Sequence, residues 1–158
     1  MQHQGSAAEL HALPLPESDG EQLWDLRPTA PALVMGSAQR ESNFDVEALR
    51  NDGIALAPRR SGGGAVFIEP DGVVWVDVLA PRGSRYWSDD LGATFLAVGE
   101  RWQAALRQLG VASEIVRASP DRSPEARLAC WAGLGWGEVT VDGAKICLLY
   151  TSPSPRDS

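Results

Sequence analysis

The residues best suited to chemistry form a glycine-rich run between positions 59 and 65. Glycine has no Cβ, so consecutive glycines let backbone amides approach a bound ligand closely. Residues 55–58 read as extended and residues 65–68 as a buried strand, which predicts a strand–loop–strand cradle. A flexible linker is the alternative, but linkers are flanked by polar, low-complexity sequence. The run consists of Arg59, Arg60, Ser61, Gly62, Gly63, Gly64 and Ala65.

This cradle differs from the common phosphate-binding loops. A P-loop places Lys-Ser or Lys-Thr directly after its glycines and then begins a helix, and the dinucleotide fingerprint needs GxGxxG at a helix start. This sequence has neither pattern at its glycine run.

Lys145 is the only lysine among 14 basic residues. Because the chain uses arginine wherever a surface cation is enough, the exception suggests a position that needs a compact, steerable ammonium. A lysine on the surface of a hairpin is the alternative.

Composition limits the classes of protein that fit. A chain of 158 residues, 44% hydrophobic and 22% charged, suits one globular domain, which we expect to be monomeric. The net charge of -7 argues against nucleic acid and anionic membranes as partners. There is no apolar run of membrane-spanning length and no signal-like N-terminus, so we expect a cytoplasmic protein.

Cysteine and histidine are scarce. Two cysteines are too few for a disulfide framework, and no Cys/His spacing resembles a zinc site, so we expect no metal centre. His3 and His11 both lie in the N-terminal segment, where a histidine triad is improbable.

The expected elements alternate between strands and helices, which predicts an α+β fold with a mixed, largely antiparallel sheet and packed helices. Asp71-Gly72 predicts a hairpin between the strands on either side of it, and Asp142-Gly143 predicts another. Apolar spacing predicts a long helix that Gly110 ends. The expected elements are a helical turn at 9–12, a first strand at 32–36, a helix at 45–51 capped by Ser42-Asn43, hairpin strands at 65–68 and 73–79, the helix at 91–109, a strand at 113–117, a loop at 119–125 and the hairpin at 138–146.

The run at 59–66 resembles the lipoate-binding loop of the lipoate–protein ligase A family, which typically reads RRxSGGGAV. Residues 33–39, LVMGSAQ, resemble its early strand and Gln-bearing turn, and residues 141–146, VDGAKI, resemble its GxKI hairpin. The resemblance covers residues 33–146. It implies the biotin-ligase-like catalytic fold related to class II aminoacyl-tRNA synthetases. Biotin ligases themselves carry a GRGR-type loop that this chain lacks.

The resemblance implies ATP-dependent activation of lipoate or octanoate to an acyl-adenylate, with Mg²⁺ accompanying ATP. The acyl group would then pass to a lysine on a lipoyl-acceptor domain of a 2-oxoacid dehydrogenase or on the glycine-cleavage H protein. Lys145 would contact the phosphate and carboxylate oxygens, while Ser61 and the glycines wrap the acyl head and the adenylate. Either arginine could orient a phosphate or act as a structural residue. Trp75 and Phe67 could line an acyl tunnel, although core packing is their commoner role.

Residues 130–138, CWAGLGWGE, depart from these ligases, which carry an Asn-Asp pair for magnesium-ATP in this region. The Cys-aromatic start resembles the related octanoyltransferases, in which a cysteine takes the acyl group as a thioester without ATP. That resemblance would make Cys130 a nucleophile; a buried, inert thiol is the alternative. A non-catalytic relative that binds lipoate or a carrier is the third hypothesis.

The last twelve residues, 147–158, resemble the translated read-through of a transposase sequencing adapter, CLLYTSPSPRD. We therefore expect residues 1–146 to be a partial catalytic domain with a non-native tail, Cys147 not to be a native thiol, and the supplied chain to have little activity.

Overall fold

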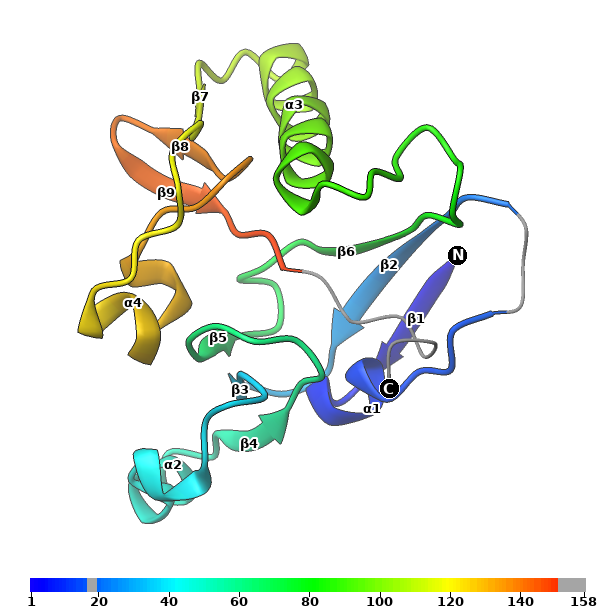
Figure 1. The fold of residues 1–158 in the computed structure, drawn as a ribbon. Helices are drawn as coiled ribbons and strands as arrows, with labels where there is room; N and C mark the ends of the chain where they lie inside the picture. Colours follow the sequence, from blue (N-terminus) through cyan, green and yellow to red (C-terminus); the bar gives the residue numbers. More distant parts are fainter. Residues whose placement is uncertain (17–19, 151–158) are drawn as a thin grey trace. The chain divides into compact units, whose positions relative to one another are not determined.

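The computed structural model describes residues 1–16 and 20–150 of the chain (Figure 1). The described residues form two compact units, Met1–Pro81 and residues 82–150, and each is described by itself. No helix among the described residues is long and apolar enough to cross a membrane. The expectation of one domain over residues 1–146 stays a prediction.

The first unit contains two three-stranded sheets, and each sheet has one parallel and one antiparallel pair. In the first sheet β2 is central, with β1 parallel and β6 antiparallel to it. In the second, β3 is central, with β4 parallel and β5 antiparallel to it. The elements are β1 (Gln2–Gly5), α1 (Ala7–His11), β2 (Gln22–Pro28), β3 (Ala32–Met35), η1 (Glu41–Asn43), α2 (Val46–Asn51), β4 (Ala55–Pro58), β5 (Val66–Ile68) and β6 (Trp75–Leu79).

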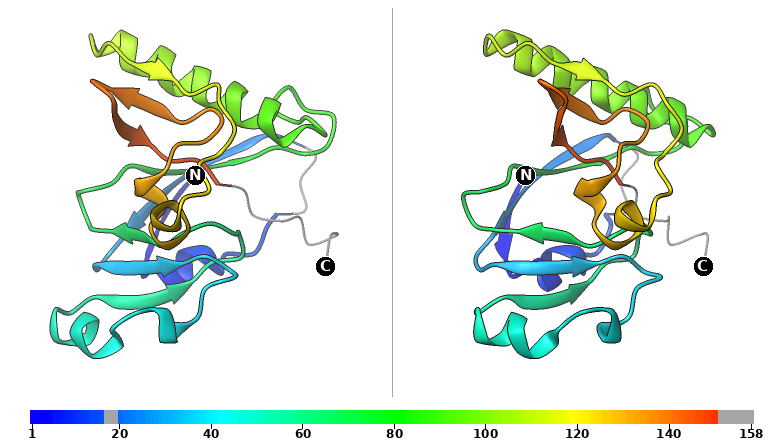
Figure 2. Two further views of the ribbon diagram at one scale, coloured as in Figure 1. Left: turned by 60° about the vertical axis from the view of Figure 1, so that its left-hand side comes forward. Right: turned by 90° about the vertical axis from the view of Figure 1, so that its left-hand side faces the viewer.

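The second unit packs the long helix α3 beside a small antiparallel sheet in the order β7-β8-β9 (Figure 2). Asp90 begins α3 by accepting hydrogen bonds from Gly92 N and Ala93 N, and the helix ends just before Gly110, whose φ is +78°. The elements are α3 (Leu91–Gln108), β7 (Glu114–Ile115), α4 (Pro124–Leu128), η2 (Cys130–Ala132), β8 (Val139–Val141) and β9 (Ala144–Cys147).

The fold class is confirmed: helices accompany small, largely antiparallel sheets. The expected cradle is also present, because β4 and β5 flank the glycine run and both pair with β3. The hairpin at 138–146 forms as predicted, and both Asp142 and Gly143 adopt positive φ, as its tight turn requires.

Three expectations for the first unit were wrong. The strands at 65–68 and 73–79 do not pair with each other, because β5 joins β3 and β6 joins β2. The strand at 32–36 is the third rather than the first. The N-cap of α2 is Asp45, whose Oδ1 accepts a hydrogen bond from Ala48 N at 2.9 Å, rather than the Ser42-Asn43 region.

In the second unit, the predicted loop at 119–125 ends in a helix. Ser123 caps α4 and Pro124 occupies its first turn, where proline needs no N–H partner.

Candidate functional site

The glycine loop is held against the turn that follows β3. Ser37 N donates to the Ser61 carbonyl oxygen at 2.9 Å, and Gly36 N donates to Gln39 Oε1 at 3.0 Å. A Cβ on Gly36 would collide with the carbonyl oxygen of Gly63, so glycine at position 36 permits this backbone contact. The upstream segment of the family resemblance therefore supports the loop directly.

Arg59 lies inside the loop. Arg59 is only 4% exposed. Its Nη2 donates to the carbonyl oxygens of Gly62 and Gly64 at 2.9 and 2.8 Å. Arg60 is exposed. Arg59 thus holds the loop's shape, while Arg60 is the arginine that solvent and solutes can reach.

Ser61 presents an unusual polar atom. The residue is 5% exposed, and its Oγ has no hydrogen-bond partner among the described residues. Gly62 and Gly63 are exposed, whereas Gly64 and Ala65 are buried. The loop thus combines open backbone with a buried hydroxyl, a combination suited to holding a small polar group.

His11 is a neighbour of the loop that the sequence reasoning set aside. Burial and, to a smaller extent, the positive charges of Arg59 and Arg60 together lower the pKa of His11 to about 4. Its ring centroid lies 4.6 Å from that of Trp75. The sequence predicted only a helical turn at 9–12, and no local signal could have placed His11 here.

The two aromatic candidates for an acyl tunnel lie in different environments. Trp75 is buried in the core of the first unit, and its Nε1 donates to Asp77 Oδ1 at 3.0 Å. Burial raises the pKa of the Asp77 carboxyl. Phe67 is 44% exposed.

In the second unit, Lys145 and Cys130 come together. The Lys145 side chain is only 4% exposed, and its Nζ donates to the backbone carbonyl of Cys130 at 2.6 Å. Lys145 lies on β9 opposite Thr140 of β8, next to a register shift. The surface alternative for Lys145 therefore does not describe this side chain.

Glu138 completes this cluster, and the sequence analysis did not single it out. Its Oε2 lies 2.9 Å from Lys145 Nζ and also accepts a hydrogen bond from Gly135 N at 2.7 Å. Burial raises the pKa of the Glu138 carboxyl, and the contact with Lys145 partly opposes that shift. The position of Glu138 at the start of the predicted hairpin, close in sequence to Cys130 and Lys145, was the signal that could have identified it.

Cys130 begins η2 and is a half-buried, free cysteine. Its neighbour Trp131 places its ring centroid 5.9 Å from Lys145 Nζ. Burial and, to a smaller extent, the Glu138 charge together raise the pKa of the other thiol, Cys147, to about 11. A thiol with that pKa supplies little thiolate near neutral pH, which argues against Cys147 as a nucleophile.

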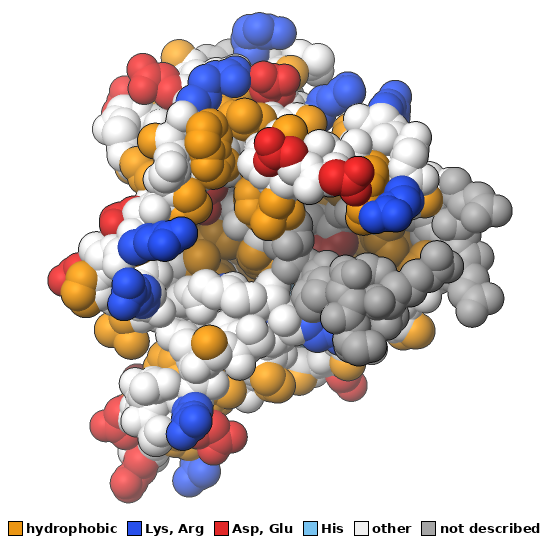
Figure 3. Space-filling view, in the orientation of Figure 1, with side chains coloured by type: hydrophobic (Ala, Val, Ile, Leu, Met, Phe, Trp, Pro, Cys, Tyr) orange, Lys and Arg blue, Asp and Glu red, His pale blue; other side chains and the backbone are white. Residues whose placement is uncertain are grey.

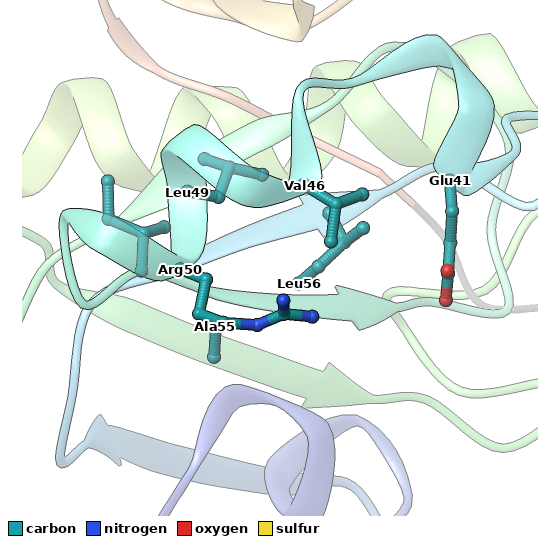
Figure 4. Close-up of a pocket in the computed structure, with 7 residues that line it drawn as sticks. Glu41, Val46, Leu49, Arg50, Ala55 and Leu56 are labelled. Carbon is teal, nitrogen blue, oxygen red and sulfur yellow. The ribbon is translucent and has the colours of Figure 1, made fainter.

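A surface hollow of about 310 Å³ lies elsewhere in the first unit, where side chains of α2 and β4 face one another (Figure 4). No residue of the glycine loop lines it.

On the face in Figure 3, Lys and Arg side chains are interspersed with Asp and Glu and form no continuous basic patch. Among the described residues, no three His, Cys, Asp or Glu side chains form a group that could hold a metal ion.

Comparison with known proteins identifies the class. Residues 10–147 match the lipoyl protein ligase A/B catalytic domain, so the chain belongs to that family. It is 29% identical over 118 residues to octanoyltransferase LipM of Moorella thermoacetica, covering 73% of this chain and 42% of LipM.

The fold resembles that of Ta0514 from T. acidophilum, which is described as a putative lipoate protein ligase and was solved with bound lipoic acid. The TM-score is 0.71 at 20% identity, over 92% of this chain and 57% of Ta0514. A second Ta0514 structure gives a TM-score of 0.62 at 22% identity, over 84% of this chain and 49% of that one. The chain thus spans about half the length of the relatives it matches.

Proposed function

We propose that this protein is a lipoyl-type acyltransferase in which Cys130 carries the acyl group as a thioester, independently of ATP. The observation that carries the proposal is the hydrogen bond of 2.6 Å from Lys145 Nζ to the Cys130 backbone carbonyl, which brings the only lysine to the residue that bears the candidate nucleophile. The similarity to an octanoyltransferase supports the same reaction.

In the first step, the Cys130 thiolate attacks the carbonyl carbon of an acyl thioester on a carrier protein. A new S–C bond forms, and the carrier's thiolate leaves. In the second step, the amine of an acceptor lysine attacks the Cys130 thioester, an amide forms, and the Cys130 thiolate leaves as the amine loses its proton to a base or to water. A positive charge beside Cys130 stabilises the negative charge that develops in both steps.

Octanoate and lipoate are the proposed acyl groups, and the glycine loop with Ser61 is the proposed binding site for the acyl head. The lipoic acid bound in Ta0514 supports this choice. Lipoyl domains of 2-oxoacid dehydrogenases and the glycine-cleavage H protein are the proposed acceptors, and the cytoplasm is the proposed location.

ATP-dependent ligation of lipoate with Mg²⁺ is the second candidate. The buried ammonium of Lys145 favours it too, because a fixed cation also stabilises charge on phosphate oxygens. This reaction predicts lipoate-dependent release of pyrophosphate, which Lys145→Ala would abolish.

We also propose that residues 1–146 are part of a catalytic domain and that residues 147–158 are a non-native tail. The family match ends at residue 147, which supports this division. Sequencing the source gene past the Ile146 codon tests it, and an open frame encoding the same tail would contradict it.

The acyl-enzyme itself is the direct test of the function. The protein, with its natural sequence after Ile146, is mixed with an octanoyl thioester of a carrier protein and measured by intact mass. We expect one octanoyl group, removable by hydroxylamine, in the protein but none in Cys130→Ser. Acyl transfer that requires ATP and survives in Cys130→Ser would refute the thioester route.

A further inference from the structure

The ion pair of Lys145 and Glu138 in the second unit is almost completely buried. The two side chains are 4% and 7% exposed, and their atoms lie 2.9 Å apart. By contrast, Arg117 and Glu100 form a 3.0 Å pair in the same unit with side chains 59% and 55% exposed. Because desolvation largely offsets the attraction within a buried pair, such a pair adds little net stability. A role beyond stability is therefore reasonable for Glu138.

The backbone around Glu138 is fixed on both sides. Glu138 N donates to the Gly135 carbonyl at 3.2 Å, and its own carbonyl accepts from Val116 N at 2.8 Å. Gly137 has a φ of +76°, and a Cβ on it would collide with the carbonyl of Phe95 in α3. The loop therefore packs directly on the helix backbone, so the carboxylate has a defined position.

The side chain of Glu138 is fixed as well, through the hydrogen bond of 2.7 Å from Gly135 N to Oε2. This is the same oxygen that contacts Lys145. The two contacts of Oε2 involve none of residues 147–150. The other carboxylate oxygen, Oε1, accepts a long hydrogen bond of 3.5 Å from Leu149 N, in the atypical end of the chain.

An ammonium group has three N–H donors. Glu138 Oε2 and the Cys130 carbonyl occupy two of those of Lys145. Two fixed acceptors determine the direction of the third donor, which has no hydrogen-bond partner among the described residues. That donor is the one left for an acyl carbonyl or a thiolate at Cys130.

We propose that Glu138 is a positioning residue that holds the Lys145 ammonium beside Cys130 and directs its remaining N–H toward the reacting group. This inference rests on the proposed function. Glu138 touches no substrate and acts only through Lys145, so its effect must disappear when the lysine is removed.

A direct test of the geometry uses the single lysine. Labelling with ¹⁵N-lysine gives one side-chain NMR signal, that of Lys145 Nζ. We expect slow proton exchange at this amine in the wild type and in the matched control Glu100→Gln, and exchange at least tenfold faster in Glu138→Gln. Unchanged exchange in Glu138→Gln would overturn the proposal.

The kinetic test measures the rate of Cys130 acylation in a single turnover. Because misplacing a reacting group by about 1 Å can cost on the order of a hundredfold in rate, we expect Glu138→Ala to approach that loss and Glu138→Gln to lose about tenfold. The concentration of acyl donor that gives half the maximal rate should stay the same in both Glu138 variants. In the control Glu100→Gln, Cys130 should be acylated at the wild-type rate. If the variants raised only the half-saturating donor concentration and left the maximal rate unchanged, a positioning role would be contradicted.

The decisive comparison is made in a Lys145→Met background. If Glu138 acts through Lys145, Glu138→Gln lowers the residual rate no further there. An equal loss in both backgrounds would overturn the proposal. If the wild type forms no acyl-Cys130, the proposed function fails, whereas the exchange measurement still decides whether Glu138 holds the amine.

Discussion

Replacing Lys145 with Met should destabilise the second unit in a pH-dependent way. The substitution removes the ammonium but keeps most of the side-chain volume, and it leaves the Glu138 carboxylate 7% exposed without its counter-ion. At 2.9 Å and an effective dielectric constant of about 20, the lost attraction is about 6 kcal/mol. Breaking buried pairs typically costs about 3–5 kcal/mol, because the remaining group relaxes or takes up a proton. We therefore expect a loss of about 3 kcal/mol in the free energy of unfolding at pH 8.

The pH dependence follows from the Glu138 carboxyl. Burial already raises its pKa above the ordinary value of 4.5, and loss of Lys145 raises it further. Between the ordinary pKa and the raised one, the folded state binds more protons than the unfolded state. The variant's free energy of unfolding therefore falls as pH rises through this window, by at most about 1.4 kcal/mol per pH unit. The difference from the wild type should be small near pH 4.5 and largest at pH 8.

Urea unfolding followed by circular dichroism from pH 4.5 to 8 measures this loss. The double variant Lys145→Met, Glu138→Leu should recover most of the stability, because it removes both charges from the interior. Arg117→Met, which breaks the exposed pair with Glu100, should cost less than about 1 kcal/mol. A loss independent of pH, or a double variant no more stable than Lys145→Met, would refute the reasoning.

Two further substitutions test how the backbone is held. Arg59→Met removes hydrogen bonds to two loop carbonyls and should lower the free energy of unfolding by about 2–4 kcal/mol. Calorimetry should also show weaker lipoate binding. Arg60 is exposed, so Arg60→Met should change the free energy of unfolding by less than about 0.5 kcal/mol. Equal effects of the two would contradict the assignment of Arg59 as the loop's support. Gly99→Ala should cost about 2 kcal/mol despite alanine's higher helix propensity, because its Cβ would collide with the Gly137 carbonyl. Gly92→Ala in the same helix is the control, and thermal unfolding that shows no difference between the two would exclude the close contact.

Features encoded over a few neighbouring residues could be predicted from the sequence. Gly62–Gly64 between two apolar strands predicted the cradle, and Asp142-Gly143 predicted a turn whose two residues both need positive φ. The apolar spacing of residues 91–109, followed by Gly110, predicted α3 nearly to its ends. In each case, the backbone preferences and the side-chain spacing of one short segment determine the result.

Strand pairing was not predictable in this way. The turn signal at Asp71-Gly72 is real, since Gly72 N donates to the Glu69 carbonyl at 3.1 Å, but the strands it separates join different sheets. The residues that pair between β2 and β6 lie at least 49 positions apart in the sequence, as Leu26 and Trp75 do. A strand chooses its partner by the face it buries and the neighbours available, and neither is visible in a local pattern.

The sequence by itself determined that Lys145 is exceptional, because it is the only lysine in the chain. It did not determine the environment of that lysine, and alternation along β9 would have suggested Ile146 inside and Lys145 outside. The structure has the opposite arrangement, with Ile146 43% exposed and the Lys145 side chain 4% exposed. Only tertiary packing decided this, because a buried ammonium needs acceptors, and the folded chain alone brings Glu138 and the Cys130 carbonyl to it.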